Sequence, residues 1–573
     1  MPRLPTRTAF LLWAACFNTT STDASPPSSP RPRPTWCDFK STEHAAKLFA
    51  LQELGNIYTR LGNPTTDVLE KRVCMLEGTH PLAGLCLASG TSAVFYSIIN
   101  VAKNGDNIVS GRNLYGGTYT QFNDILPKMG ITVRGAHSFT RSHGPFTLPS
   151  PRVCALRFLP CPQRVALPAS MCMLRLATQV RFVDETDPEN FVKAMDDKTR
   201  AFFCETCSNP ACIVTDLEKI STLAHSNGVP LIVDATFSTP YLTKPISYGA
   251  DVVCHSLTKW MGGHGTGIGG IVVDAGTFKW GAGKVAHAPL SASHWPLVPF
   301  HTPLFVHYSP RATRHFPHPS IPLQHPLYSE PDSSYGELRW GLDLPEMLAP
   351  LAFILRMRTV PLRNLGAAIS PDNSWIFLQG IETLPLRMEK HCANALAVAK
   401  FLQSHPQVEW VKYPGLEGDK QYELQKKYLK GKGGAMVIFG VKGGKEAGQK
   451  VIESFTVFSH VANVGDAKSL AIHPASTTHS QMNAEQQAAA GVPPEMVRLA
   501  VGLEDPADLI ADLEHALTPA PPKPAFQNRE DMKTYLANSN LESLVTAAVA
   551  AVIQERPEHP AARVGEILLA GPN

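Results

Sequence analysis

The stretch from residue 231 to residue 270 limits the possible folds more than any other part of the chain. Its sequence is LIVDATFSTPYLTKPISYGADVVCHSLTKWMGGHGTGIGG, in which two short apolar runs are each followed by polar residues. Such runs, rich in Val and Ile and bounded by turn residues, predict buried strands of a parallel sheet. Ligands of open α/β sheets bind at the carboxyl ends of the strands. Asp234 and Lys259 follow the two runs, so we expect both to face one ligand.

The residue types at these strand ends suit pyridoxal 5'-phosphate (PLP). This cofactor requires an amine for its aldehyde, an acid for its ring nitrogen and small donors for its phosphate. Lys259 provides the amine and Asp234 the acid, while Ser256 and Thr258 carry hydroxyl groups. A lone lysine after a strand is more often a solvated loop residue. The glycine-rich run at residues 262–270 favours the cofactor site, because such a run has an entropic cost unless the backbone must approach a ligand closely.

Two further strand ends carry residues that suit the same ligand. One apolar run ends before Ser89, Gly90 and Thr91, which begin a predicted helix. Amide donors at a helix N-terminus bind anions, although a plain N-cap is the commoner meaning of such a serine. Tyr115 follows another predicted strand, at residues 107–110. Its ring could cover a planar ligand, and the alternative is a half-buried loop tyrosine.

Strands and helices alternate along most of the chain. This pattern predicts a doubly wound α/β domain with a mostly parallel sheet. A smaller α/β domain follows, with strands expected at residues 408–411 and 435–441. In its last strand, residues 497–501, Arg498 has only apolar neighbours in sequence. Buried arginines are nearly always paired, and a substrate carboxylate and a structural salt bridge are equally good partners for this one.

Several segments do not fit the alternation. Residues 1–41 are expected to be a disordered or targeting leader, and breaks at about 136–180 and 281–329 look like insertions without chemistry. A Pro-rich linker spans residues 518–530. The tail, residues 531–573, has a helical apolar stripe and predicts a hairpin that dimerises, because two short helices cannot bury their own stripes.

Composition narrows the class of protein further. The chain has 573 residues and a net charge of +3, which gives no case for binding nucleic acid. No apolar run is long enough to span a bilayer. The 12 cysteines are scattered, which predicts mostly reduced thiols, and the Cys204/Cys207 spacing is interpreted as incidental. The histidines of the second break lack paired ligand spacing, so no metal site is expected.

Taken together, the motifs resemble those of a known family. They are NIYTRLGNPT, ASGTSA, LYGGTYTQF, ETCSNPA, IVDATFSTPYL, HSLTKWMGGHGTGIGG, SHVANVGDAKSLAIHPASTTH and VRLAVGLED. The chain resembles the Cys/Met-metabolism (trans-sulfuration) family of PLP-dependent enzymes, and within it most closely the O-acetylhomoserine sulfhydrylases. The resemblance implies the fold type I of PLP-dependent transferases. The tail resembles the docking-and-dimerisation helix hairpin of protein kinase A regulatory subunits.

The resemblance also implies a role for each residue of the motifs. Lys259 would bond to the cofactor and shuttle protons, Asp234 would pair with the ring nitrogen, and Tyr115 would stack on the ring. Arg498, helped by Ser469, would hold the substrate carboxylate. The remaining cofactor contacts would come from Ser89, Gly90, Thr91, Ser256 and Thr258 around the phosphate, Asn209 at the ring oxygen, and Tyr58 and Arg60 reaching the phosphate of a neighbouring subunit.

The implied reaction replaces the acetate of O-acetylhomoserine by sulfide and yields homocysteine, in methionine and cysteine biosynthesis. The alternatives are a cystathionine γ-synthase, a methionine or cystathionine γ-lyase, and a catalytically impaired assembly subunit that acts through its tail. A homotetramer is expected, in the cytoplasm or, if the leader is a targeting peptide, in an organelle. The expected large domain spans residues 42–343, and the connecting helix and small domain span residues 344–517.

Overall fold

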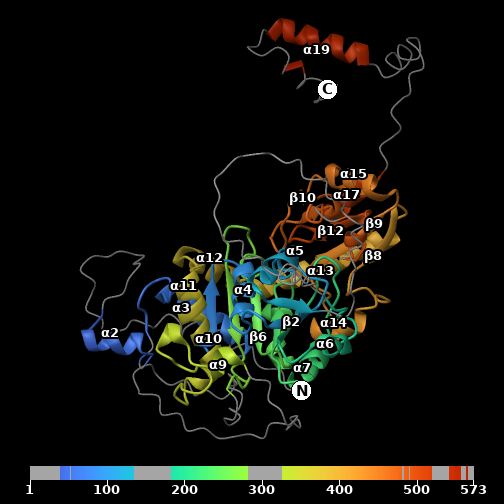
Figure 1. Ribbon diagram of the computed structural model, residues 1–573. Coiled ribbons are helices and arrows are strands. Elements are labelled where there is room, and N and C mark those ends of the chain that lie inside the picture. Colours follow the sequence, from blue (N-terminus) through green and yellow to red (C-terminus); the bar gives the residue numbers. More distant parts are fainter. Residues whose placement is uncertain are drawn as a thin grey trace, which may run out of the picture. The chain divides into compact units, whose positions relative to one another are not determined.

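The computed structural model describes residues 39–51, 53, 55–134, 182–281, 325–480, 483–489, 491–518, 541–555 and 563–564. The chain divides into two compact units, Met1–Ala516 and Leu517–Asn573. The first unit contains two sheets with the helices that cover them, as Figure 1 shows. The predicted leader, linker and first break lie wholly or mostly outside the described residues.

A sheet of seven strands forms the centre of the large domain. Its order is β1-β7-β6-β5-β4-β2-β3, and only the pairings of β7, with β1 and with β6, are antiparallel. The mostly parallel sheet predicted from the sequence is therefore confirmed. The strands are β1 (Gly84–Leu87), β2 (Asn107–Ser110), β3 (Thr132–Arg134), β4 (Thr199–Glu205), β5 (Leu231–Asp234), β6 (Val252–Ser256) and β7 (Gly270–Asp274).

Helices cover both faces of this sheet, which explains why its strands are apolar throughout. Successive side chains of a strand point to opposite faces. Phe202 and Val233 accordingly belong to one hydrophobic core, and their neighbours Phe203 and Ile232 belong to the other. The first core includes residues of α3 (Pro64–Glu77), α7 (Leu217–Ser226), α12 (Pro371–Glu382) and α13 (Leu384–Ser404), and the second those of α4 (Gly90–Ile99) and α10 (Ala352–Met357).

The helix α3 begins and ends where its sequence predicts. The side chain of Asn63 accepts a hydrogen bond from the amide of Thr65, and Pro64 occupies the first turn. Gly78 ends the helix in the left-handed conformation, with φ of 85°, which glycine adopts without steric cost. The other helices of the large domain are α2 (Thr42–Phe49), α5 (Gly116–Thr120), α6 (Glu189–Ala194), α8 (Thr239–Leu242), α9 (Pro326–Ser329) and α11 (Arg363–Leu365).

The smaller sheet has five strands in the order β10-β11-β12-β9-β8. It belongs to the same compact unit as the large sheet. The strands are β8 (Val408–Lys412), β9 (Met436–Val441), β10 (Ser459–His460), β11 (Leu470–Ile472) and β12 (Met496–Ala500), and the further helices are α14 (Tyr422–Tyr428), α15 (Gly444–Ser454), α16 (Ala484–Ala489) and α17 (Pro506–Leu517).

The end of the second predicted break is part of the fold. Our boundary placed residues up to 329 in the insertion, yet Tyr328 in α9 is fully buried and its ring stacks on Trp280. The boundary at residue 329 was therefore wrong, because a Pro-rich segment concealed a short helix with one large apolar residue. Residues 282–324 of this break lie outside the described part of the chain.

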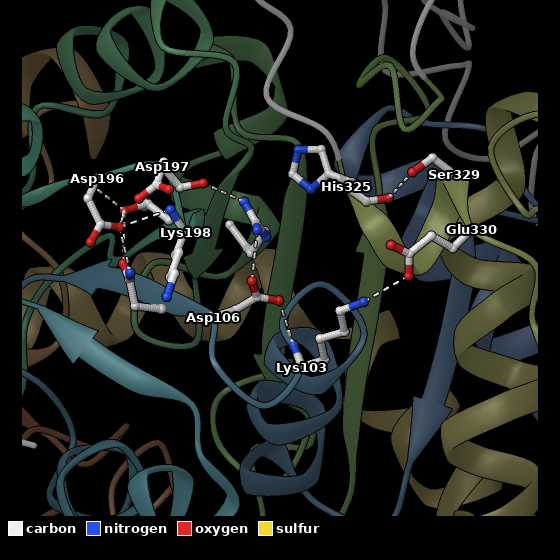
Figure 2. Close-up of polar contacts among 11 residues, drawn as sticks. Lys103, Asp106, Asp196, Asp197, Lys198, His325, Ser329 and Glu330 are labelled. Atoms are coloured by element: carbon white, nitrogen blue, oxygen red, sulfur yellow. Dashed lines mark hydrogen bonds and ion pairs between the residues drawn. The ribbon is translucent and has the colours of Figure 1, made fainter. Parts of the chain in front are cut away.

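Polar contacts secure the amino-terminal edge of the large sheet, opposite the predicted site (Figure 2). The guanidinium of Arg200, at the start of β4, lies 2.8 Å from a carboxylate oxygen of Asp106, and both side chains are nearly buried. Asp106 also accepts a hydrogen bond from the amide of Lys103, whose ammonium forms an exposed ion pair with Glu330 beyond α9. These contacts join the loop before β2 to β4 and to the segment after the second break.

The second unit contains the helix α19 (Leu541–Glu555). Ala548 is fully buried, whereas Val545, Val549 and Ile553 are exposed at intervals of four residues. The predicted helix thus exists, but most of its expected hairpin partner, at residues 556–573, lies outside the described residues. No helix within the described ranges is long and apolar enough to cross a membrane.

The two ion pairs of Figure 2 provide a matched test of the fold. Asp106→Ala leaves the nearly buried Arg200 without its carboxylate, and breaking such a pair should lower the free energy of unfolding by roughly 3 kcal/mol. Lys103→Met removes only the exposed pair with Glu330 and should cost less than about 1 kcal/mol. Urea denaturation measures both. Equal effects of the two substitutions would contradict this account.

Candidate active site

Three neighbouring strands end in polar residues at one edge of the large sheet. Glu205 ends β4, Asp234 ends β5 and Ser256 ends β6. The strands are parallel and in register, with Glu205 opposite Asp234 and Asp234 opposite Cys254. Lys259 follows three residues after β6. The structure thus places the acid and the amine at the carboxyl edge, where the sequence predicted a ligand.

Asp234 is tied to the end of β6 through one hydroxyl group. One of its carboxylate oxygens accepts hydrogen bonds from the amide (2.9 Å) and the hydroxyl (2.5 Å) of Thr236. The same hydroxyl accepts a bond from the amide of Ser256, at 2.8 Å. Burial raises the pKa of Asp234. A cationic ring nitrogen next to the carboxylate would offset the cost of burying its charge.

Three backbone segments meet where the phosphate of the cofactor is expected. A Cβ atom added to Gly90 would lie 2.5 Å from the Cβ of Ser256, and one added to Gly270 would lie 2.2 Å from the carbonyl oxygen of Ser89. Only glycine fits at such separations. Ser89 caps the ten-residue helix α4, and amides at a helix N-terminus are suited to an anion. The strand-end serine of the sequence analysis is therefore both an N-cap and part of a cradle.

Thr258 and Thr91 are each adjacent to residues of this cradle. The hydroxyl of Thr258 accepts a hydrogen bond from the amide of Gly269, at 3.0 Å, and so joins the lysine loop to the start of β7. Thr91 follows Gly90 in the first turn of α4 and is exposed. The structure thus brings Ser89, Gly90, Ser256 and Thr258 together, with Thr91 next to them in sequence.

The amine of Lys259 is held by the small domain. Its Nζ donates a hydrogen bond of 2.5 Å to the side-chain oxygen of Asn463. Burial, together with the nearby charge of Arg498, lowers the pKa of the lysine to about 8. Gly465 also packs directly on the lysine loop, since a Cβ there would lie 2.5 Å from the amide nitrogen of Trp260. One short segment of the small domain, residues 463–465, therefore contacts both the amine and the backbone of the lysine loop.

Arg498 is buried without an acidic partner. It lies on β12 with 6% of its surface exposed, and burial lowers its pKa to about 10. Its guanidinium donates to the side-chain oxygen of Asn209 at 3.0 Å and to the main-chain carbonyl of Asn463 at 3.5 Å. No carboxylate of the described residues forms an ion pair with it. Of the two alternatives left open by the sequence, the structural salt bridge is not formed within the described part of the chain.

Tyr115 and Asn209 are positioned by a residue that the sequence analysis missed. The amide of Tyr115 donates to one carboxylate oxygen of Glu205 at 2.7 Å, and the amide of Asn209 donates to the other at 3.2 Å. The tyrosine remains 47% exposed. Glu205 could have been found, because it follows an apolar run in the same way as Asp234.

Ser469 is not where the resemblance implied. Its side chain is fully buried, donates to Glu504 at 2.8 Å and accepts a bond from the amide of Gly502 at 2.8 Å. Both partners belong to the turn after β12, so the hydroxyl braces this turn. Asn463, six residues earlier in the same quoted motif, contacts both Lys259 and Arg498 instead. The structure therefore places Asn463 in the position expected of Ser469.

Tyr58 and Arg60 form a separate group. Arg60 lies over the ring of Tyr58, 5.6 Å from its centroid, and donates to the carbonyl of Arg363. Tyr58 is 45% exposed. The structure records no hydrogen bond from either residue to the cradle at Ser89.

The comparisons with known proteins agree with this geometry. A sequence profile of the family of Cys/Met metabolism PLP-dependent enzymes matches residues 29–142 and 169–518, and the chain belongs to this family. Its cofactor is PLP. The profile leaves residues 143–168, inside the first predicted break, unmatched, and it ends before the tail. The family profile therefore gives no support to the resemblance between the tail and the docking-and-dimerisation hairpin of protein kinase A regulatory subunits.

Individual relatives include sulfhydrylases and homocysteine synthases. The chain is 45% identical to O-acetyl-L-homoserine sulfhydrylase of Leptospira meyeri over 484 residues, which cover 84% of this chain and 89% of that protein. It is 39% identical to homocysteine synthase of Schizosaccharomyces pombe over 480 residues, 84% of this chain and 91% of the relative.

A solved structure shares the fold. It is assigned to an O-acetylhomoserine (thiol)-lyase of Campylobacter jejuni and contains a pyridoxyl-lysine monophosphate. It has a TM-score of 0.66 and 34% identity, and the alignment covers 86% of this chain and 95% of that chain. The fold type I architecture inferred from the motifs is confirmed.

The lowered pKa of Lys259 predicts how its amine reacts in the cofactor-free protein. The neutral amine should predominate above about pH 8, and acylation by acetic anhydride should rise with pH around that value. Arg498→Met removes a neighbouring positive charge and should move this midpoint upward. Mass spectrometry of the peptide measures the extent of acylation at each pH, with exposed lysines as internal references. A midpoint that coincides with that of the exposed lysines would contradict the prediction.

Proposed function

We propose that the chain is an O-acetylhomoserine sulfhydrylase, which replaces the acetate on Cγ of O-acetylhomoserine by sulfide and yields homocysteine. The observation that carries the proposal is Arg498, a buried guanidinium that pairs with no acid of the described residues and is linked through Asn463 to the amine of Lys259. An amino acid whose carboxylate binds this arginine would have its reacting carbons near the lysine. The names of the relatives support the substrate pair.

The cofactor, when bound, supplies an electron sink for carbanion chemistry. Lys259 is proposed to bond to it and to move the protons of the reaction between Cα and Cβ of the substrate. A pKa of about 8 keeps part of the amine neutral near physiological pH, where an acid–base catalyst is most effective. Asn463 orients the amine by accepting its hydrogen bond.

The other proposed roles concern binding. Asp234 would hold the ring nitrogen, and its two bonds from Thr236 fix the direction of the carboxylate. Tyr115 would cover the ring, since its side chain is free enough of the core to do so. The proposed phosphate ligands are Ser89, Gly90, Thr91, Ser256 and Thr258, and Asn209 would contact the ring oxygen while it supports Arg498.

Assembly is proposed from the same residues. The exposed Tyr58 and its stacked partner Arg60 are free of the cradle of their own chain, which supports a role at the phosphate of a neighbouring subunit in a homotetramer. The exposed valines of α19 support a tail that pairs with a second copy of itself. The proposed location is the cytoplasm, or an organelle if residues 1–41 act as a targeting peptide.

The substrate assignment predicts a strict requirement for both reactants. The purified chain with PLP should consume O-acetylhomoserine only when sulfide is present, and Lys259→Ala should lower kcat by roughly 10³-fold or more. Arg498→Met should raise the KM for O-acetylhomoserine on the order of 10²-fold, because a buried charge-assisted contact is lost. Arg498→Lys keeps the positive charge but loses the planar guanidinium fork, so its KM should lie between that of the native chain and that of Arg498→Met.

Product analysis separates the alternatives. Formation of cystathionine from cysteine would identify a cystathionine γ-synthase, and release of a keto acid from methionine or cystathionine without sulfide would identify a γ-lyase. Homocysteine as the main product supports the sulfhydrylase. A Lys259→Ala variant with full activity would exclude PLP chemistry at this site altogether.

The tail proposal predicts a change in assembly without a change in chemistry. Deletion of residues 531–573 should reduce the mass of the oligomer in light scattering, while kcat with O-acetylhomoserine and sulfide stays the same. A double substitution of exposed valines, Val545→Asp with Val549→Asp, should have the same effect, because charge cannot be buried in an apolar helix contact. An unchanged mass for both variants would count against pairing through α19.

A further inference from the structure

Glu205 is a buried carboxylate for which the proposed chemistry has no use. It ends β4 with 6% of its surface exposed. Asp234 lies directly opposite on β5. Burial, with the charge of Asp234 next in importance, raises the pKa of Glu205 well above its usual range. Keeping a second acid at this edge is costly, since like charges in a buried site oppose each other.

Two other buried glutamates, Glu70 and Glu77, have a cationic or imidazole partner that offsets this cost. Glu70 lies 2.6 Å from the guanidinium of Arg358, and Glu77 lies 2.6 Å from the ring of His255. The described residues give Glu205 no such partner. Its two recorded hydrogen bonds come from main-chain amides, at Tyr115 and at Asn209.

These two amides belong to the two segments that carry the site. Tyr115 follows β2 and immediately precedes α5. Asn209 lies in the turn after β4, and its side-chain oxygen accepts a bond from Arg498 at 3.0 Å. One carboxylate therefore fixes the segment of the ring tyrosine with one oxygen and, through Asn209, the substrate arginine with the other.

We propose that Glu205 is a positioning residue that sets the orientation of Tyr115 and, through Asn209, of Arg498. The proposal rests on the functions proposed above for these residues. A carboxyl group is suited to this task because its two oxygens accept from two separate amides at once. A glutamine of the same shape keeps only one acceptor oxygen.

The test uses Glu205→Gln in the full-length, PLP-loaded chain. L-2-Aminobutyrate, which has no leaving group on Cγ, serves as the probe, and its dissociation constant is read from the cofactor absorbance. The dissociation constant of PLP itself is measured by titration of the cofactor-free protein. Loss of one of the two buried hydrogen bonds leaves an amide without its acceptor and should raise at least one of these two constants roughly tenfold to hundredfold.

A double-mutant cycle shows whether the effect passes through Asn209. If it does, Glu205→Gln should raise the dissociation constant of L-2-aminobutyrate much less in an Asn209→Ala background than in the native chain. Additive effects on this constant, together with an unchanged constant for PLP, would overturn the proposal. A merely structural role for Glu205 would not produce this coupling.

Glu185→Gln is the matched control. Glu185 is equally buried and accepts bonds from the amide of Arg112 and the side chain of Asn113, but not from Tyr115 or Asn209. The Glu185→Gln substitution should leave both dissociation constants unchanged. Equal shifts in Glu185→Gln and Glu205→Gln would overturn the proposal. If Glu205→Gln does not fold, as judged by circular dichroism, Glu205→Asp replaces it, because a carboxylate drawn back by one methylene also loses contact.

The outcome also separates this proposal from the proposed function. If native protein binds L-2-aminobutyrate and the Arg498→Met variant does not, the assignment of Arg498 stands whatever Glu205 does. If Glu205→Gln then matches native protein in both constants, the positioning role alone fails. If native protein and Arg498→Met bind the probe equally, the proposed function itself fails.

Discussion

The close approach of three backbone segments at Gly90 and Gly270 is the constraint on which the rest of the site depends. A side chain at either position would overlap main-chain or side-chain atoms of the opposite segment. Because α4, β6 and β7 meet there without side chains between them, Ser89, Ser256 and Thr258 converge on one small volume. The hydroxyl of Thr236 extends this arrangement to Asp234. Cradle and acid are thus parts of one packed unit.

Much of this arrangement follows from local sequence. The strands of the large sheet are short apolar runs that end in polar residues, so the rule for parallel sheets placed Asp234 and Lys259 at one edge. The same rule applied to β4 would have found Glu205, whose position in ETCSNPA resembles that of Asp234 in IVDATF. Periodicity likewise predicted α3 with its Asn63 cap and the helix α19.

The rest depends on contacts between residues far apart in sequence. Nothing near Ser469 indicates that its hydroxyl pairs with Glu504, whereas Asn463 reaches the lysine of another domain. That no acid of the described residues lies next to Arg498 is likewise a property of the assembled core, since any of the chain's carboxylates could have met it. The end of the second break was misjudged because a single buried ring, Tyr328, carries the signal of α9.

Because Asn463 contacts both Lys259 and Arg498, the spacing between the two domains affects the reactive amine directly. The side-chain oxygen of Asn463 accepts from the amine on the large domain, and its carbonyl accepts from the guanidinium on the small one. A hinge rotation that separates the sheets would lengthen the first contact while it carries the second along. The hydrogen bonding of the Lys259 amine and the position of Arg498, which would bind the carboxylate of an amino acid, would then change in the same rotation.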